Sequence, residues 1–172
     1  MNYFKKIFIT FLSALILTVV NTSSSFAKVE GDTIVLGAAV SLTGKYSSNG
    51  VHTQNGYNLA VERINSMGGV KVKGKNYKFK IIYYDDESNS GRAAQLAERL
   101  IKQDGVQYML GPYSSGLTKA MAPVTEKYKI PMVEANGASR SLFTKGYKYL
   151  FAVLAPANLY LDVAIDLAVE KN

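Results

Sequence analysis

Two short loops of this sequence carry groups that can hold the two charges of a small ligand. Residues 111–116 (GPYSSG) run from an apolar segment directly into a helical pattern. The unpaired backbone N–H groups at a helix start, together with a serine hydroxyl, can bind a carboxylate. Ser114 or Ser115 can equally cap that helix, and the residues alone leave open what the second hydroxyl does.

The second loop comprises residues 136–139 (NGAS). Gly137 allows a close approach of the backbone, and carbonyl oxygens with the Ser139 hydroxyl can accept hydrogen bonds from an ammonium group. An ordinary turn is the alternative, and the residues alone favour it. If the two loops follow adjacent parallel strands, a carboxylate site faces an ammonium site, which together describe a free amino acid.

The sequence gives little indication of a catalytic or metal-binding site. Asp85 and Asp86 are adjacent, but no third carboxylate or histidine is placed to complete a metal site or an acid–base pair. We expect them to cap the helix that begins near Ser90 and to end a strand. His52, the single histidine, lacks a cysteine or second histidine as partner. No dinucleotide or phosphate-binding glycine motif is present. The sequence predicts a binding protein rather than an enzyme, with no catalytic residue, metal or cofactor.

Apolar runs alternate with helical patterns through most of the chain, which implies right-handed crossovers and an α/β, Rossmann-like, doubly wound parallel sheet. Ligands bind such sheets beyond the carboxyl ends of the strands. In the loop at 41–50, Tyr46 or Asn49 can contact a ligand, although an ordinary surface loop is the more common outcome. Strands are expected at 33–40, 79–84, 106–110, 132–133 and 149–154, and helices through 57–64, 90–101 and 117–128, with Pro123 bending or splitting the last.

The first residues are typical of a secretory signal peptide. Lys5 and Lys6 precede an apolar run of 14 residues, and Ser25-Phe26-Ala27 follows as a cleavage site. The run is shorter than the roughly 20 residues of a membrane-spanning helix. Cleavage after residue 27 lowers the formal net charge by two, from +7 to +5. We therefore expect a periplasmic or secreted protein. The lysines around Gly74 are accompanied neither by a helix that could contact base edges nor by aromatic side chains on which bases could stack. Their pattern therefore argues against nucleic-acid binding.

Five stretches in this order resemble one known family over nearly the whole mature chain. The family is the type I periplasmic binding proteins of the leucine/isoleucine/valine class, the substrate-binding components of branched-chain amino acid ABC transporters. The stretches are IVLGAAVSLTG (34–44), GYNLAVERINSMGGV (56–70), YYDDESN (83–89), MLGPYSSGLT (109–118) and IPMVEANGAS (130–139).

The resemblance implies roles for particular residues. Ser115 falls where the family binds the ligand α-carboxylate, and Ala138 and Ser139 fall where a carbonyl and a hydroxyl receive the α-ammonium. Tyr113 is placed in the side-chain pocket. Asn49 stands where some members carry an aromatic residue. This difference leaves open which ligand side chains are preferred, and polar, amide or urea-type ligands are among the candidates. The predicted ligand-binding set is Ser115, Ala138, Ser139, Tyr113, Ser114, Gly137 and Asn49.

The resemblance also implies a two-lobed protein. We expect residues 1–27 to be the signal peptide, 28–155 the ligand-binding lobe one, and 156–172 the first helix of a truncated lobe two. That helix, expected over 157–170, is apolar nearly all round, so the chain reads as an amino-terminal fragment. The implied protein is a monomer that closes on an amino acid and delivers it to the membrane permease of an ABC transporter. A ligand-sensing domain of a receptor with the same fold is the alternative.

Overall fold

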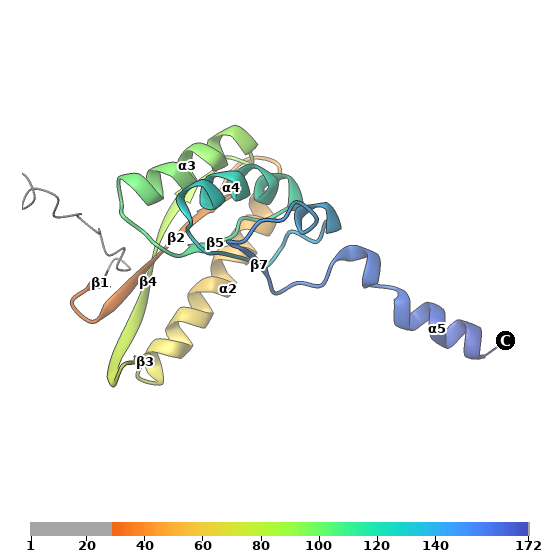
Figure 1. Cartoon of the computed structure of the whole chain (residues 1–172), viewed down its shortest axis with the longest axis horizontal. Helices are drawn as coiled ribbons and strands as arrows, with labels where there is room; N and C mark the ends of the chain where they lie inside the picture. The colour runs from red at the N-terminus through yellow and green to blue at the C-terminus, as the bar shows by residue number, and fades with distance from the viewer. Residues whose placement is uncertain (1–28, 172) are drawn as a thin grey trace, which may run out of the picture.

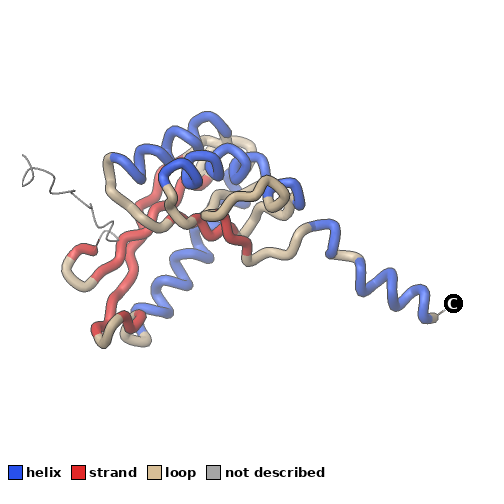
Figure 2. Tube along the Cα trace, viewed as in Figure 1, coloured by secondary structure: helices blue, strands red, loops and turns tan. Residues whose placement is uncertain are grey.

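The computed structural model describes residues 29–171 of the chain, so the predicted signal peptide lies outside the described residues. The strands are β1 (Val29–Glu30), β2 (Thr33–Val40), β3 (Val70–Val72), β4 (Lys75–Asp85), β5 (Met109–Leu110), β6 (Met132–Glu134) and β7 (Leu150–Ala152). The helices are α2 (Ser47–Ser66), α3 (Ser90–Lys102), α4 (Ser115–Tyr128) and α5 (Asp162–Glu170), with 3₁₀ turns at Arg140–Leu142 and Ala157–Leu159. Figure 2 shows helices, strands and loops along the trace.

The sheet confirms the predicted parallel α/β architecture. Its strand order is β3-β4-β2-β5-β6-β7, and β2, β4, β5, β6 and β7 run parallel to one another. β1 and β3 are antiparallel additions to β2 and β4. Because β4 lies on one side of β2 and β5 on the other, the chain order reverses at β2. The carboxyl end of β2 is therefore the place where a ligand crevice is expected.

Helices cover the sheet on both faces. Figure 1 shows α3 and α4 together on one face and α2 on the other. The hydrophobic core fills the space between the strands and the α3–α4 layer, because both helices turn their apolar stripes toward the sheet. Fully buried members of this core include Val35, Ala39, Leu100, Met109, Leu117 and Met121.

α2 begins earlier than the sequence indicated, at Ser47, so the expected loop over 41–50 ends at residue 46. A Cβ on Gly50 would lie 1.8 Å from the Ser41 carbonyl oxygen, so the glycine lets the first turn of the helix pack onto the end of β2. The predicted stop at Gly68-Gly69 is confirmed, since both glycines have positive φ.

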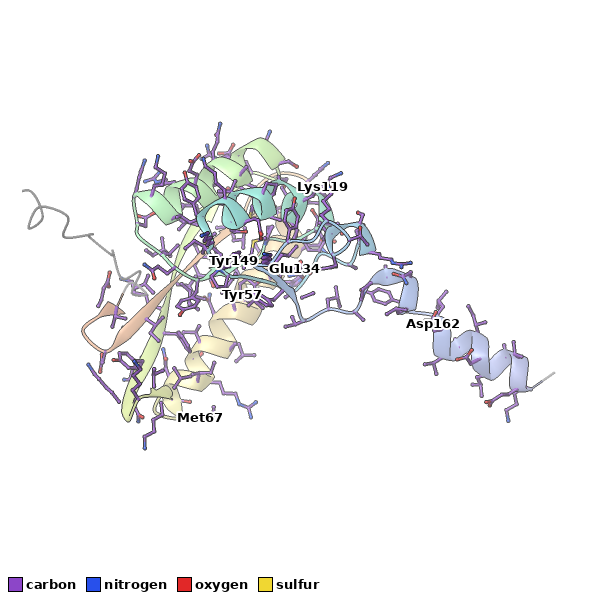
Figure 3. All side chains as sticks on the ribbon, in the orientation of Figure 1. Tyr57, Met67, Lys119, Glu134, Tyr149 and Asp162 are labelled. Atoms are coloured by element: carbon purple, nitrogen blue, oxygen red, sulfur yellow. The ribbon has the colours of Figure 1, made fainter. Side chains whose placement is uncertain are left out.

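Two further expectations need correction. The third strand is only Met109–Leu110, because residues 106–108 form the connection after α3, where the Val106 amide donates to the Leu100 carbonyl. α4 is not split at Pro123. Proline leaves the carbonyl of Lys119 without its amide partner, and Lys119 is an exposed residue, where water can take that place (Figure 3).

The segment after β7 leaves the body of the domain. Figures 1 and 2 show α5 projecting away from the sheet. The expected continuous helix over 157–170 is wrong in extent: a 3₁₀ turn comes first, and α5 starts at Asp162, whose carboxylate in the first turn favours a helix start there. Its apolar side chains are exposed, Val163 by 80%. Between residues 29 and 171, no helix is both long and apolar enough to cross a bilayer.

Candidate ligand-binding site

The start of α4 presents unpaired hydrogen-bond donors. Ser114 is the N-cap, and its hydroxyl accepts a hydrogen bond from the Leu117 amide at 3.4 Å. Ser114 has a φ of 83°, a strained value for a residue other than glycine. Within residues 29–171, the amides of Ser115 and Gly116 have no hydrogen-bond acceptor. With Ser114 as the cap, the Ser115 hydroxyl is not needed for capping.

The two predicted loops meet. The Ser139 amide donates to the Ser115 hydroxyl oxygen at 3.1 Å, which joins the start of α4 to the loop after β6. They meet because β5 and β6 are adjacent parallel strands, so both loops leave the same edge of the sheet. In the described part of the chain, the Ser115 hydroxyl hydrogen has no acceptor, so it can be donated to an anion. The predicted juxtaposition of these loops is confirmed.

Glu134, at the end of β6, organises the second loop. Its carboxylate oxygen Oε2 accepts from the amides of Asn136 and Gly137 and from the Thr118 hydroxyl, the first of these at 3.1 Å and the last at 3.3 Å. A Cβ on Gly137 would lie 2.6 Å from this oxygen, so the close approach that the glycine permits is to Glu134. Glu134 therefore fixes the backbone from which Ala138 and Ser139 follow.

Two further groups of this loop also have partners within the protein. The Ala138 carbonyl accepts from the Ala157 amide at 2.8 Å, which ties the loop to the segment leaving β7. The Ser139 and Ser141 hydroxyl oxygens are 2.9 Å apart. A carbonyl oxygen has two lone pairs, so the Ala138 carbonyl can still accept a second hydrogen bond. The loop is thus held in place before any ligand arrives.

Glu134 is fully buried, and its second oxygen, Oε1, has no partner among the described residues. Burial raises the pKa of this carboxyl, although the two loop amides and Thr118 oppose that shift. Figure 3 labels Glu134 and Tyr57 in the middle of the molecule. Burial, with the charge of Glu134, also raises the pKa of Tyr57 above its usual range. Sequence reasoning missed Glu134; a carboxylate ending an otherwise apolar strand was the available signal.

An open hollow of about 380 Å³ lies beside these loops. Of the predicted set, only Asn49 and Tyr113 line it, whereas Ser114, Ser115 and residues 137–139 do not. The Tyr46 ring packs edge-on against Tyr113, with centroids 5.6 Å apart. Sequence reasoning missed the other members of the wall, which are His52, Thr53, Gly56, Tyr57, Ala135 and Asn136.

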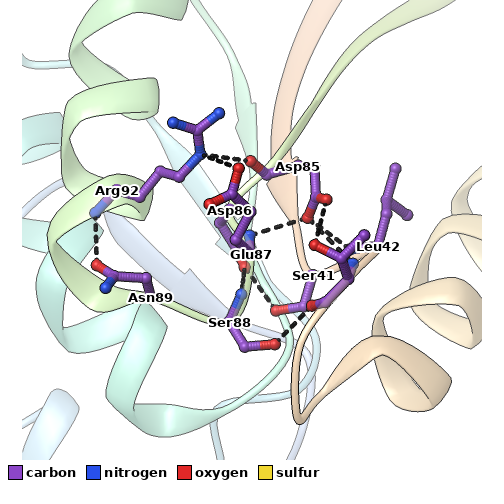
Figure 4. Close-up of polar contacts among 9 residues, drawn as sticks. Ser41, Leu42, Asp85, Asp86, Glu87, Ser88, Asn89 and Arg92 are labelled. Carbon is purple, nitrogen blue, oxygen red and sulfur yellow. Dashed lines mark hydrogen bonds and ion pairs between the residues drawn. The ribbon is translucent and has the colours of Figure 1, made fainter.

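Asp85 and Asp86 connect two other loops, as Figure 4 shows. Asp85 accepts from the amides of Leu42 and Thr43, and Asp86 accepts from the Ser41 hydroxyl at 2.6 Å. The expectation that these aspartates cap the following helix is wrong. Asn89 is the cap of α3, because the Asp86 side chain is already turned back toward β2 and buried.

Throughout residues 29–171, no three His, Cys, Asp or Glu side chains are grouped so that they can hold a metal ion. His52 lies on α2 and lines the hollow. The chemistry that this region offers is hydrogen bonding: amides and a hydroxyl at the start of α4, and polar side chains along the hollow.

Comparison with known proteins identifies similar chains. A family described as periplasmic binding protein matches residues 33–172. The "Leucine-, isoleucine-, valine-, threonine-, and alanine-binding protein" of Pseudomonas aeruginosa is 26% identical over 140 residues, which are 81% of this chain and 36% of that protein. The chain thus spans little more than a third of the length of this curated relative.

Solved structures show the same similarity. The branched-chain amino acid transporter substrate binding protein LivJ from Streptococcus pneumoniae, in complex with isoleucine, has a TM-score of 0.65 and 28% identity over 78% of this chain and 39% of its own. An ABC transporter solute binding protein from R. palustris, in complex with 4-hydroxybenzoate, has a TM-score of 0.66 and 29% identity over 82% of this chain and 37% of its own.

Proposed function

The chain belongs to the periplasmic binding protein family, and from this premise we propose that it is part of the substrate-binding component of an ABC transporter. It captures amino acids, branched-chain or related, outside the cytoplasm for import. The names of its relatives support this choice, since they bind leucine, isoleucine or valine. The relative in complex with 4-hydroxybenzoate widens the ligand class to other small carboxylates.

One observation carries the proposal: the start of α4 offers two unpaired amides and the Ser115 hydroxyl at the sheet edge where a ligand is expected. The positive end of the helix dipole lies at the same place. Isoleucine and 4-hydroxybenzoate, bound by the two relatives, have a carboxylate in common. A carboxylate is the group that this arrangement stabilises best.

The remaining features of the function follow from the same premise. The signal peptide is removed after residue 27, and the mature protein works in the periplasm as a monomer. Residues 28–155 form lobe one, and the segment from residue 156 leads into a second lobe. Hinge closure of two lobes around a ligand is an established transition of periplasmic binding proteins. The closed form delivers its ligand to a membrane permease, and no reaction is catalysed.

The test is calorimetric titration of the complete mature protein with matched ligands. Leucine and 4-hydroxybenzoate are each compared with the analogue that lacks the carboxylate, 3-methylbutylamine and phenol. We expect at least one free amino acid or small carboxylate to bind, and its decarboxylated analogue to bind at least about a hundredfold more weakly, because the site amides are then left unpaired. Equal binding of acid and analogue would refute the proposed function.

A further inference from the structure

One face of α2 forms a wall of the hollow. Residues 49, 52, 53, 56 and 57 line it, and their spacing places them on one side of a helix, along its first turns. The sequence pattern was searched for an apolar stripe on this helix, so the face toward the hollow, whose side chains are mostly polar, was overlooked. The same hollow includes Tyr113 and Asn136, from the loops that follow β5 and β6.

Gly56 keeps this wall concave. A glycine inside a helix is less favourable than alanine, so its presence in the middle of α2 is not explained by helix stability. Nor is it explained by packing, since a Cβ added at Gly56 would meet nothing within 4 Å. Because Gly56 lines the hollow, its missing side chain leaves space there that a ligand atom can occupy.

Tyr57 contributes a neutral hydrogen-bond acceptor. Its hydroxyl donates to the Gly111 carbonyl oxygen at 2.8 Å, so its single hydrogen is already used. The phenol oxygen can still accept one hydrogen bond. Because burial raises the pKa of Tyr57, the phenol stays uncharged in neutral solution. A group that interacts with this oxygen must therefore be a donor.

Apart from the imidazole of His52, the polar side chains of the wall are neutral hydrogen-bonding groups. Asn49, Thr53 and Asn136 carry amides or a hydroxyl, and none of the described residues lining the hollow carries a carboxylate, ammonium or guanidinium group. Much of the surface of the hollow is apolar, but a hydrocarbon placed against Asn49, Thr53 or Asn136 would displace water from a polar group without replacing its hydrogen bonds, which is unfavourable. A cationic group would find no carboxylate among the described residues that line this wall.

We propose that the hollow receives the far end of a carboxylate ligand that bears a neutral hydrogen-bond donor, a carboxamide or a hydroxyl, in preference to a plain aliphatic side chain. The inference rests on the proposed function, because it takes the ligand carboxylate to lie at the start of α4. It narrows the ligand class from amino acids in general to polar, uncharged ones and hydroxylated carboxylates.

Isosteric ligand pairs test this directly by calorimetry on the complete mature protein. Asparagine is compared with leucine, threonine with valine, and 4-hydroxybenzoate with 4-methylbenzoate, so that shape is held nearly constant while the donor is removed. We expect the polar member of at least one pair to bind about tenfold or more tightly than its partner. The three pairs distinguish a carboxamide from an aliphatic or an aromatic hydroxyl.

The outcomes separate the inference from the proposed function. If amino acids or small carboxylates bind but in none of the three pairs the polar member binds about tenfold more tightly than its partner, the inference is overturned while the proposed function stands. If no amino acid or small carboxylate binds, the proposed function fails and the inference falls with it.

A matched pair of variants tests the role of Tyr57. Tyr57→Phe removes only the phenol oxygen, and we expect it to lower the ratio of the affinities for the polar and aliphatic ligands at least about threefold. Tyr83→Phe is the control, because the Tyr83 hydroxyl bonds to the Asn58 side chain, outside the hollow. An unchanged preference in Tyr57→Phe would overturn the assignment of this oxygen as the acceptor.

Discussion

Two pairs of loops leave the same edge of the sheet and differ in how they use their polar groups. The β2/β4 loop pair (residues 41–46 and 86–89) is tied together by hydrogen bonds that cross between the loops, such as Tyr46 amide to Ser88 hydroxyl at 3.0 Å. The β5/β6 loop pair (residues 111–115 and 135–139) meets through the Ser139 amide and Ser115 hydroxyl, and leaves amides at the start of α4 unpaired.

The difference distinguishes polar groups that hold the fold together from polar groups that remain available to a ligand. Most polar groups in the β2/β4 loop pair bond to one another, and the exception among the described residues is the buried Asp86 Oδ2. In the β5/β6 loop pair, Glu134 accepts hydrogen bonds from the second loop, but the amides at the start of α4 have no acceptor within residues 29–171. Backbone groups without protein partners must bond to water or to a ligand. Variants of residues that hold one loop pair or the other test this contrast.

The largest effect is expected at Glu134. Glu134→Ala leaves the amides of Asn136 and Gly137 without an acceptor in a largely buried place, whereas the Thr118 hydroxyl can still donate to the Ser114 carbonyl. We expect the free energy of unfolding, measured by urea titration, to fall by about 4 kcal/mol. Glu134→Gln is the control, because its amide oxygen can still accept these hydrogen bonds; it should lose less than half as much. Equal losses in both variants would show that the loop does not depend on these bonds.

A smaller effect should distinguish the two loop pairs. Asp85→Ala removes the acceptor of the Leu42, Thr43 and Glu87 amides, and we expect a loss of about 2 kcal/mol in the free energy of unfolding, since water can partly replace it. Ser115→Ala, which removes a bond across the β5/β6 loop pair, should cost less than about 1 kcal/mol. If Ser115→Ala is the more destabilising change, the contrast between the pairs is wrong.

The smallest effect is a pH dependence of opposite sign at two neighbouring residues. Burial raises the pKa of Asp86, whereas hydrogen bonds from Thr43, Glu87 and Leu42 outweigh desolvation and lower the pKa of Asp85. Asp86 therefore makes its whole contribution to the free energy of unfolding below about pH 4, the pKa of an aspartate in the unfolded chain. This contribution is lost as pH rises through the higher pKa that Asp86 has in the folded protein. Asp85 contributes stability above about pH 4 that is lost as pH falls through its lower folded value.

Urea titrations of the wild type, Asp86→Asn and Asp85→Asn between pH 2 and pH 7 check this prediction. The stability of the wild type relative to Asp86→Asn should decrease as pH rises above about 4. Relative to Asp85→Asn, it should decrease as pH falls below that value. Two differences that change in the same direction would mean that the environments of the two carboxyls have been misassigned.

Much of the fold could be predicted from the sequence because its elements have local signals. Continuous apolar runs gave the parallel strands, Gly68-Gly69 marked the end of α2, and the strand-to-helix transition at Ser114-Ser115 located the start of α4. The start of α2 could not be found, because Tyr46 precedes it without a side-chain cap and Gly50 resembles a loop residue.

The site could be predicted only where a single loop supplies the chemistry. The role of Glu134 depends on the amides of Asn136 and Gly137 folding back onto it, together with Thr118 from another element. The wall of the hollow depends on which face α2 turns toward β5, and its polar residues carry no hydrophobic signal. Both arise from tertiary packing, which periodicity in one segment cannot reveal.

The central claim is that the start of α4 holds the carboxylate of the ligand. The most direct test is calorimetric titration of Ser115→Ala in the complete mature protein with the tightest carboxylate ligand found. Loss of a hydrogen bond to a charged group predicts a dissociation constant at least about tenfold weaker than that of the wild type. A dissociation constant equal to that of the wild type, in a variant that unfolds at the same urea concentration, would contradict it.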